Sequence, residues 1–240
     1  FCMSRRVNDY ETIGWHLSEI TKLEVRNYGV GGYGIDQALL RLEQVLSEDS
    51  STKRYTDIVF IITPYTLARA CSIYRHYLEP GNTFAVKPYL KLESDGNHIV
   101  MPTPVKTKEQ LKSLNQFSDY FHKYDIHYRN RAWLIKNLEQ YYSSFWISEK
   151  EIFFSIIRVL EKLQKIHNLQ ISIVVTWGRT FLGRHNLTMP TPWVETCIEA
   201  QNHCPSIRCI DIMPELLDKF SDLSEVWLSH GEGHLSAQAN

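Results

Sequence analysis

The sequence has almost no excess charge, no long apolar run and few glycines. The formal net charge of the 240 residues is −1 at pH 7, which gives no electrostatic reason to expect nucleic acid or an anionic membrane as a partner. No apolar run reaches the length of a membrane-spanning helix. We therefore expect a chain without a transmembrane segment and with no nucleic-acid partner, and the sequence leaves its cellular compartment open.

Cysteine pairs of the C-x-x-C type are also missing. His203 and Cys204, beside Cys197 and Cys209, offer donor atoms that zinc uses, but their spacing matches no familiar zinc site. Cysteine is among the most buried residue types. The sequence therefore predicts ordinary core thiols, with no metal and no cofactor. The five cysteines are Cys2, Cys71, Cys197, Cys204 and Cys209.

The apolar pattern predicts strands that alternate with helices. Residues 57–63 and 171–177 are short, nearly continuous apolar runs, which are typical of strands covered on both faces. Strands separated by helices predict one α/β domain over residues 1–240, with a parallel sheet and right-handed crossovers. Residues 23–28 form a further β-prone run, and a short strand is expected over 206–210. Helical spacing of apolar residues predicts helices over 35–46, over 192–202 and near 214–220. A capping box at residue 148 predicts the start of another helix.

The middle of the chain departs from this alternation. An Asp95-Gly96 turn between two short β-prone runs predicts a hairpin. Polar, aromatic-rich helical stretches follow it. We interpret residues 75–146 as an insertion, a β-hairpin plus helices, that serves as a lid or a partner surface.

Four of the eleven glycines fall within residues 29–34. Gly29, Gly31 and Gly34 spell G-x-G-x-x-G between a β-prone run and a helix, the setting of a dinucleotide-binding fold. That fold also needs an acidic residue at the end of the next strand, where this chain has Thr63-Pro64. A dinucleotide-binding oxidoreductase is therefore the least favoured alternative, and a tight turn with glycines for steric reasons is another.

The C-terminal segment carries a second polar motif. Glu232 precedes His234 by two residues in the sequence SHGEGHLSAQAN. A carboxylate in this position can orient an imidazole so that the imidazole acts as a general base.

The glycine loop, the apolar strand over 57–63 and the terminal histidine motif together resemble the SGNH, or GDSL-type, serine hydrolases. The resemblance covers most of the chain outside the insertion. It implies a three-layer α/β/α sandwich of the flavodoxin-like kind. It also implies hydrolysis or transfer of an acyl ester of a carbohydrate, a lipid or another small molecule, without a cofactor.

The resemblance also implies roles for three residues of this chain. Gly32 takes the place of the glycine whose backbone N–H binds the oxyanion, and His234 that of the general base. Glu232 is its acidic partner, although the family usually has Asp there. As an alternative, a catalytically silent binding domain with the same fold remains open.

The chain departs from the family pattern at the oxyanion donor. The family's third motif supplies an Asn side chain directly after the second core strand, and residues 63–69 contain no Asn. Thr63, Thr66 and Arg69 are the substitutes that the sequence offers. Loss of one oxyanion donor typically lowers turnover by about 10²–10³-fold, so the departure does not exclude catalysis.

The nucleophile is the second departure. In the family motif a valine follows the serine by seven residues, and the count back from Val7 places the serine immediately before Phe1. We therefore expect that truncation removed the first strand together with the nucleophile. Ser4 is the alternative nucleophile.

Overall fold

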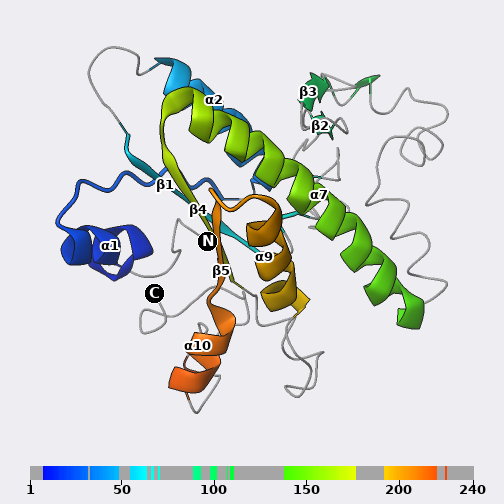
Figure 1. The fold of residues 1–240 in the computed structure, drawn as a ribbon. Helices are drawn as coiled ribbons and strands as arrows, with labels where there is room; N and C mark the ends of the chain where they lie inside the picture. The colour runs from blue at the N-terminus through cyan, green and yellow to red at the C-terminus, as the bar shows by residue number, and fades with distance from the viewer. Residues whose placement is uncertain are drawn as a thin grey trace.

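The structure, a computed structural model, shows a mixed α/β fold with a parallel sheet and helices (Figure 1). This confirms the predicted fold class at that level. The described residues are 8–31, 33–48, 55–63, 66–67, 70, 89–92, 98–101, 107, 109–110, 138–176, 192–220 and 225.

The three-stranded sheet has the order β1 (Asp57–Ile62), β4 (Gln170–Val175) and β5 (Arg208–Asp211). Both neighbouring pairs are parallel. Ile62 stands opposite Val175, which stands opposite Asp211, so the three strands end at one edge, called here the carboxyl edge. The strands expected over 57–63, 171–177 and 206–210 are thus confirmed, with bounds shifted by one or two residues.

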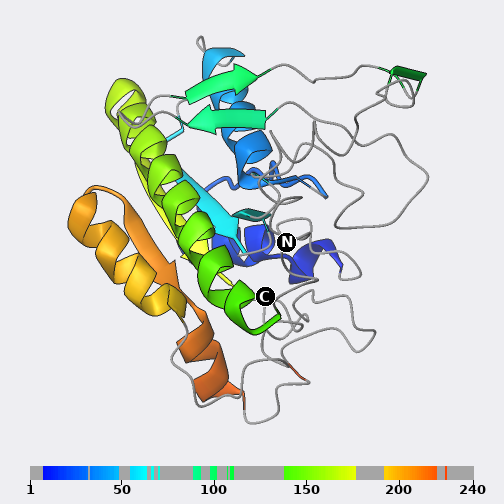
Figure 2. The same cartoon turned by 90° about the vertical axis from the view of Figure 1, so that its right-hand side faces the viewer.

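Two helices cover one face of this sheet. α7 (Leu138–His167) leads into β4 and α9 (Pro192–His203) leads into β5, and both lie on the same side of the strands in two perpendicular views (Figures 1 and 2). Along β4, alternate side chains are buried and the intervening ones are half-buried, because only one set faces the helices. The buried set is Ile171, Ile173 and Val175.

α2 (Ile35–Glu48) is the helix expected behind the glycine loop. Its buried apolar residues recur every three or four positions along one stripe, and Ile35, Leu39 and Leu42 belong to the core cluster that also contains Phe60 and Ile62. In both ribbon views α2 and β1 run in opposite directions, so the first turn of α2 lies toward the carboxyl edge. The buried stripe consists of Ile35, Leu39, Leu42 and Val45.

A glutamine organises the turn between α7 and β4. Asn168 adopts a left-handed φ of 53° after the helix, and the Leu169 N–H donates to the Gln164 carbonyl at 3.1 Å, which closes the helix end. The Gln164 side chain also accepts from the Ile171 N–H at 3.3 Å and donates to the Ser206 carbonyl at 3.2 Å. This side chain therefore ties the starts of β4 and β5 together.

The capping-box prediction at residue 148 is wrong. α7 begins at Leu138, and Ser148 and Glu151 lie inside it. The S-x-x-E pattern also fits the interior of a helix, and the ten residues before Ser148 contain no proline or glycine to stop the helix from extending upstream.

The predicted strand over 23–28 is also wrong: these residues form no strand. Leu23 is 57% exposed and Val25 is 38% exposed. Alternating apolar residues become a strand only when a neighbour takes up the backbone hydrogen bonds, and no strand in the described part of the chain pairs with them.

The predicted hairpin is confirmed as the antiparallel pair β2 (Tyr89–Leu92) and β3 (His98–Met101). α7 starts within the range interpreted as an insertion, 75–146, and that division of the chain stays a prediction.

The remaining elements are η1 (Asp9–Glu11), α1 (Ile13–Thr21) and α10 (Met213–Lys219). α1 contains no buried residue and lies apart from the layer of α7 and α9 (Figure 1). α10 continues directly from β5 and confirms the helix expected near 214–220. Among the described helices, none combines the length and the apolar character that a bilayer crossing requires.

Candidate functional site

Polar residues follow the strands at the carboxyl edge. Thr63 comes directly after β1 and Thr176 directly after β4, while Asp211 is the last residue of β5. The Thr176 N–H donates to the Ile62 carbonyl at 2.9 Å, which brings the first two strand ends side by side. Ligands of open parallel α/β sheets bind at this edge, so it is the candidate site.

Thr63 carries a hydroxyl that is both buried and unpaired. The residue is 1% exposed, and among the described residues its Oγ1 has no hydrogen-bond partner. Buried polar atoms without a partner are rare in folded proteins. The Thr63 hydroxyl is therefore an exception to the usual pairing of buried polar atoms.

Thr66, the neighbouring candidate from the sequence, is committed to the backbone. Its hydroxyl donates to the Thr63 carbonyl at 2.6 Å and accepts from the Thr63 N–H at 3.1 Å. These two bonds close the turn behind β1. They leave neither the Thr66 hydroxyl nor the Thr63 N–H free for a ligand.

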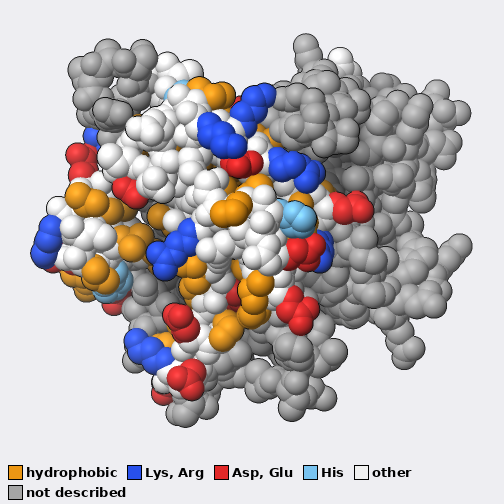
Figure 3. All heavy atoms as spheres, viewed as in Figure 1, with side chains coloured by type: hydrophobic (Ala, Val, Ile, Leu, Met, Phe, Trp, Pro, Cys, Tyr) orange, Lys and Arg blue, Asp and Glu red, His pale blue; other side chains and the backbone are white. Residues whose placement is uncertain are grey.

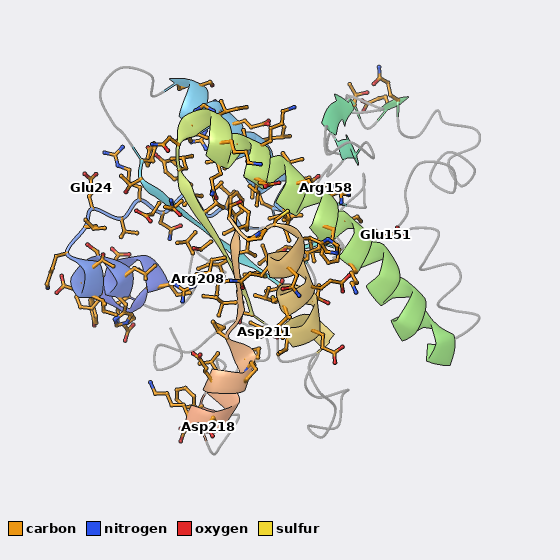
Figure 4. All side chains as sticks on the ribbon, viewed as in Figure 1. Glu24, Glu151, Arg158, Arg208, Asp211 and Asp218 are labelled. Atoms are coloured by element: carbon orange, nitrogen blue, oxygen red, sulfur yellow. The ribbon has the colours of Figure 1, made fainter. Side chains whose placement is uncertain are left out.

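The polar side chains at the ends of β4 and β5, Thr176 and Asp211, contact other residues of the fold. The Thr176 hydroxyl is fully buried and lies 3.9 Å from the sulfur of Met213. The Asp211 carboxylate accepts from the Met213 N–H at 2.9 Å, in the position where β5 passes into α10 (Figure 4). Both side chains therefore support the connection to α10.

The glycine loop uses two of its N–H groups internally. The Gly29 N–H donates to the Asn27 side chain at 2.9 Å, and the Gly34 N–H donates to the Gln37 side chain at 3.2 Å. A bound phosphate would have to displace both side chains. Together with the missing strand before the loop, this argues against a dinucleotide cradle and for turn glycines.

The predicted catalytic residues Gly32, Glu232 and His234 lie outside the described residues. The same holds for Ser4 and Arg69. Their roles therefore stay predictions.

Sequence reasoning missed Thr176 and Asp211 as members of this edge. The signal was present, because Thr176 is the first polar residue after the run ISIVV and Asp211 closes the run RCI. The end of each parallel strand marks the same edge.

The cysteines that the structure describes are core thiols. Cys197 and Cys209 are buried, and the Cys209 thiol donates to the Cys197 sulfur at 2.8 Å. This contact, followed by burial, raises the pKa of Cys197 well above its ordinary value. Burial also raises the pKa of Cys204, whose thiol donates to Glu161 at 3.7 Å. The core-thiol prediction is confirmed for these three.

The suggested zinc ligands do not converge. His203 lies edge-on to the Phe154 ring, with centroids 5.7 Å apart, and Cys204 faces Glu161 rather than the Cys197–Cys209 pair. Within the described part of the chain, no three metal-ligating side chains gather.

The face shown in Figure 3 carries no field of a single sign. On the face in Figure 3, Lys and Arg side chains are interspersed with Asp and Glu side chains. An example is the ion pair between Lys150 of α7 and Glu199 of α9.

No model of a known protein family, no curated protein and no solved structure gives a significant match to this chain. The likeness to the SGNH hydrolases therefore rests on the motifs alone.

Proposed function

We propose that this protein is a serine ester hydrolase or acyltransferase of the SGNH type. In this proposal the described sheet and its helices belong to a three-layer α/β/α sandwich. The substrate is an acyl ester of a carbohydrate, a lipid or another small molecule.

One observation carries the proposal: the loop after β1 and the glycine loop before α2 lie toward the same edge of the sheet. Thr63 follows β1 at the carboxyl edge, and the first turn of α2, which begins at Ile35 directly behind the glycine loop, lies toward the same edge (Figures 1 and 2). The proposed chemistry requires this proximity, because these two loops supply oxyanion donors in the family that the motifs resemble.

The proposed mechanism passes through a covalent acyl-enzyme. His234 takes the proton from a serine hydroxyl, and the serine oxygen attacks the ester carbonyl. Glu232 holds the imidazole in the correct tautomer, and the Gly32 N–H binds the oxyanion. The intermediate collapses, the alcohol leaves with the proton from His234, and water or a second alcohol then takes up the acyl group. The nucleophile is the serine expected directly before Phe1, with Ser4 as the alternative.

The second candidate is a catalytically silent binding domain of the same fold. It is favoured by the lack of an Asn in residues 63–69. In this case the carboxyl edge would bind a ligand without turnover.

A serine-directed fluorophosphonate, applied to the full-length protein, separates the two candidates. We expect labelling of the wild type and a loss of labelling rate of at least about 10²-fold in His234→Ala, because general-base catalysis contributes this much. His203→Ala is the matched control, since His203 ends α9 at the exposed, opposite edge of the sheet. Labelling that does not depend on His234 contradicts the assigned base, and no labelling of the wild type supports the silent domain.

A further inference from the structure

Cys197 and Cys209 face each other in the layer between α9 and the sheet. Cys197 lies on the buried side of α9, with Ala200 and Cys204 at helical spacing. Cys209 is buried on β5 and stands opposite Ile173, a residue of the β4 set that faces the helices. The two thiols therefore approach each other from adjacent elements, twelve positions apart in the sequence.

The contact between these two sulfurs is short. They lie 2.8 Å apart, a distance typical of an O–H···O hydrogen bond, although sulfur is a larger atom than oxygen. The bond length of a disulfide is about 2.0 Å, so the two sulfurs would have to approach by less than about 1 Å. Cys204 instead faces a carboxylate oxygen of Glu161 at 3.7 Å. The geometry thus singles out one pair among the three described thiols.

We propose that Cys197 and Cys209 form a disulfide when the chain folds in an oxidising medium, and that the free thiols of the structure are the reduced form of this pair. The bond would link α9 covalently to β5. In a reducing medium both thiols would persist. This inference does not depend on the proposed hydrolase or acyltransferase function.

The bond forms by thiol–disulfide exchange with a small disulfide such as oxidised glutathione. The thiolate of one cysteine attacks a glutathione sulfur, the S–S bond of oxidised glutathione breaks, and one glutathione thiolate leaves. The second cysteine thiolate then attacks the cysteine sulfur of the mixed disulfide, and the second glutathione leaves. The cysteine pair loses two electrons, oxidised glutathione gains them, and the two thiol protons end on the two glutathione molecules.

Burial determines when this exchange takes place. In the folded chain Cys197 is 3% exposed and Cys209 is 6% exposed, so an oxidant of the size of glutathione does not reach them. The raised pKa of Cys197 also keeps its thiol protonated, whereas the thiolate is the attacking form. The exchange therefore takes place in the folding chain, before α9 packs on the sheet. After folding, the same burial protects the bond from reductants.

The test is to refold the full-length protein from urea and reductant into a buffer of reduced and oxidised glutathione, and then to alkylate the free thiols in denaturant and map the peptides. Trypsin cleaves after Arg208 and so releases Cys209 on a separate peptide. Cleavage after Glu199 then separates Cys197 from Cys204. We expect the Cys197 peptide linked to the Cys209 peptide, with Cys204 alkylated. Alkylation of both Cys197 and Cys209, or a link from either of them to another cysteine, overturns the proposal.

Thermal unfolding gives a second readout with a matched control. The protein refolded with oxidised glutathione should have a Tm about 5–10 °C above that of the protein refolded with reductant, because the cross-link restricts the unfolded chain. Cys204→Ala changes an equally buried thiol directly after α9 and should keep this shift. Cys197→Ala should lose the shift. An equal shift in Cys197→Ala shows that a different bond is responsible and overturns the proposal. If Cys197→Ala does not fold, the peptide map of the wild type and of Cys204→Ala still decides.

Discussion

The sheet core and the N-terminal segment 8–31 place similar apolar side chains in opposite surroundings. In the core, Ile173 is 1% exposed and Leu160 is fully buried. In the N-terminal segment, Ile20 is 79% exposed and Leu23 is 57% exposed. The comparison shows that an apolar side chain becomes buried only where another element packs against it.

The N-terminal segment is held mainly by polar contacts instead. The hydroxyls of Tyr28 and Tyr55 lie 2.6 Å apart, and the Arg41 guanidinium of α2 lies over the Tyr28 ring at 5.8 Å. Arg26 pairs with Glu24 (labelled in Figure 4), and this hydrogen bond raises the pKa of Arg26. These contacts join residues 24–28 to the start of β1 and to α2.

The two regions should differ most in how much the free energy of unfolding falls when an isoleucine is replaced by alanine. Ile173→Ala removes a fully packed side chain and should lower the free energy of unfolding by about 2–5 kcal/mol. Ile20→Ala, at an exposed helix position, should change it by less than about 0.5 kcal/mol. Urea unfolding of both variants measures the contrast, and similar losses would show that Ile20 is packed in solution.

The second largest effect is expected at alkaline pH, which should lower the free energy of unfolding through the buried thiols of the core. The pKa of Cys197 and that of Cys204 are raised above the ordinary value of 9.0, so above pH 9 the unfolded chain loses thiol protons that the folded chain keeps. Stability from these thiols is therefore complete below pH 9 and decreases above it, by at most about 1.4 kcal/mol per pH unit for each thiol.

Cys197→Ala isolates the contribution of one thiol. Urea unfolding between pH 8 and pH 10.5 should give a shallower decline for this variant than for the wild type, whatever its stability at neutral pH. Identical slopes would contradict the raised pKa of Cys197.

A smaller effect is expected at the start of α1. The Thr12 side chain accepts from the Trp15 N–H at 3.2 Å and caps the helix. Thr12→Ala should therefore cost about 1 kcal/mol of helix stability. Because α1 has no buried residue, we expect faster amide exchange in 13–21 with little change in global unfolding. A fall in global stability without faster exchange in α1 would contradict this interpretation.

The smallest effect is expected for the ion pair between α7 and α9. Lys150 and Glu199 have side chains that are 42% and 43% exposed, and exposed pairs contribute about 0.2–1 kcal/mol. A double-mutant cycle with Lys150→Ala and Glu199→Ala should give a coupling energy in this range that falls in 1 M salt. A coupling that is larger and independent of salt would place the pair in a drier environment than the structure shows.

The sequence predicted those parts of the fold whose signal is local and whose partner is a neighbour in the sheet. The apolar runs of β1 and β4, the stripe of α2 and the Asp95-Gly96 turn all gave the correct element. The run 23–28 failed because strand formation depends on a partner that the local pattern does not specify. The capping box failed because the same four residues also fit the interior of a longer helix.

The candidate site was predictable only in part. The sequence offered Thr63, Thr66 and Arg69 as equal substitutes for the missing Asn. That Thr66 is committed to the backbone became clear only from the hydrogen bonds within the turn after β1, which depend on backbone geometry. The convergence of Thr176 and Asp211 on the same edge required the strand register.

The most direct test of the proposed chemistry is to locate the fluorophosphonate label in the full-length protein by peptide mass mapping. The account predicts a single labelled serine on the N-terminal side of Val7, either the one directly before Phe1 or Ser4. It also predicts loss of that label in His234→Ala. A label on a residue C-terminal to Val7, or no label at all, would contradict it.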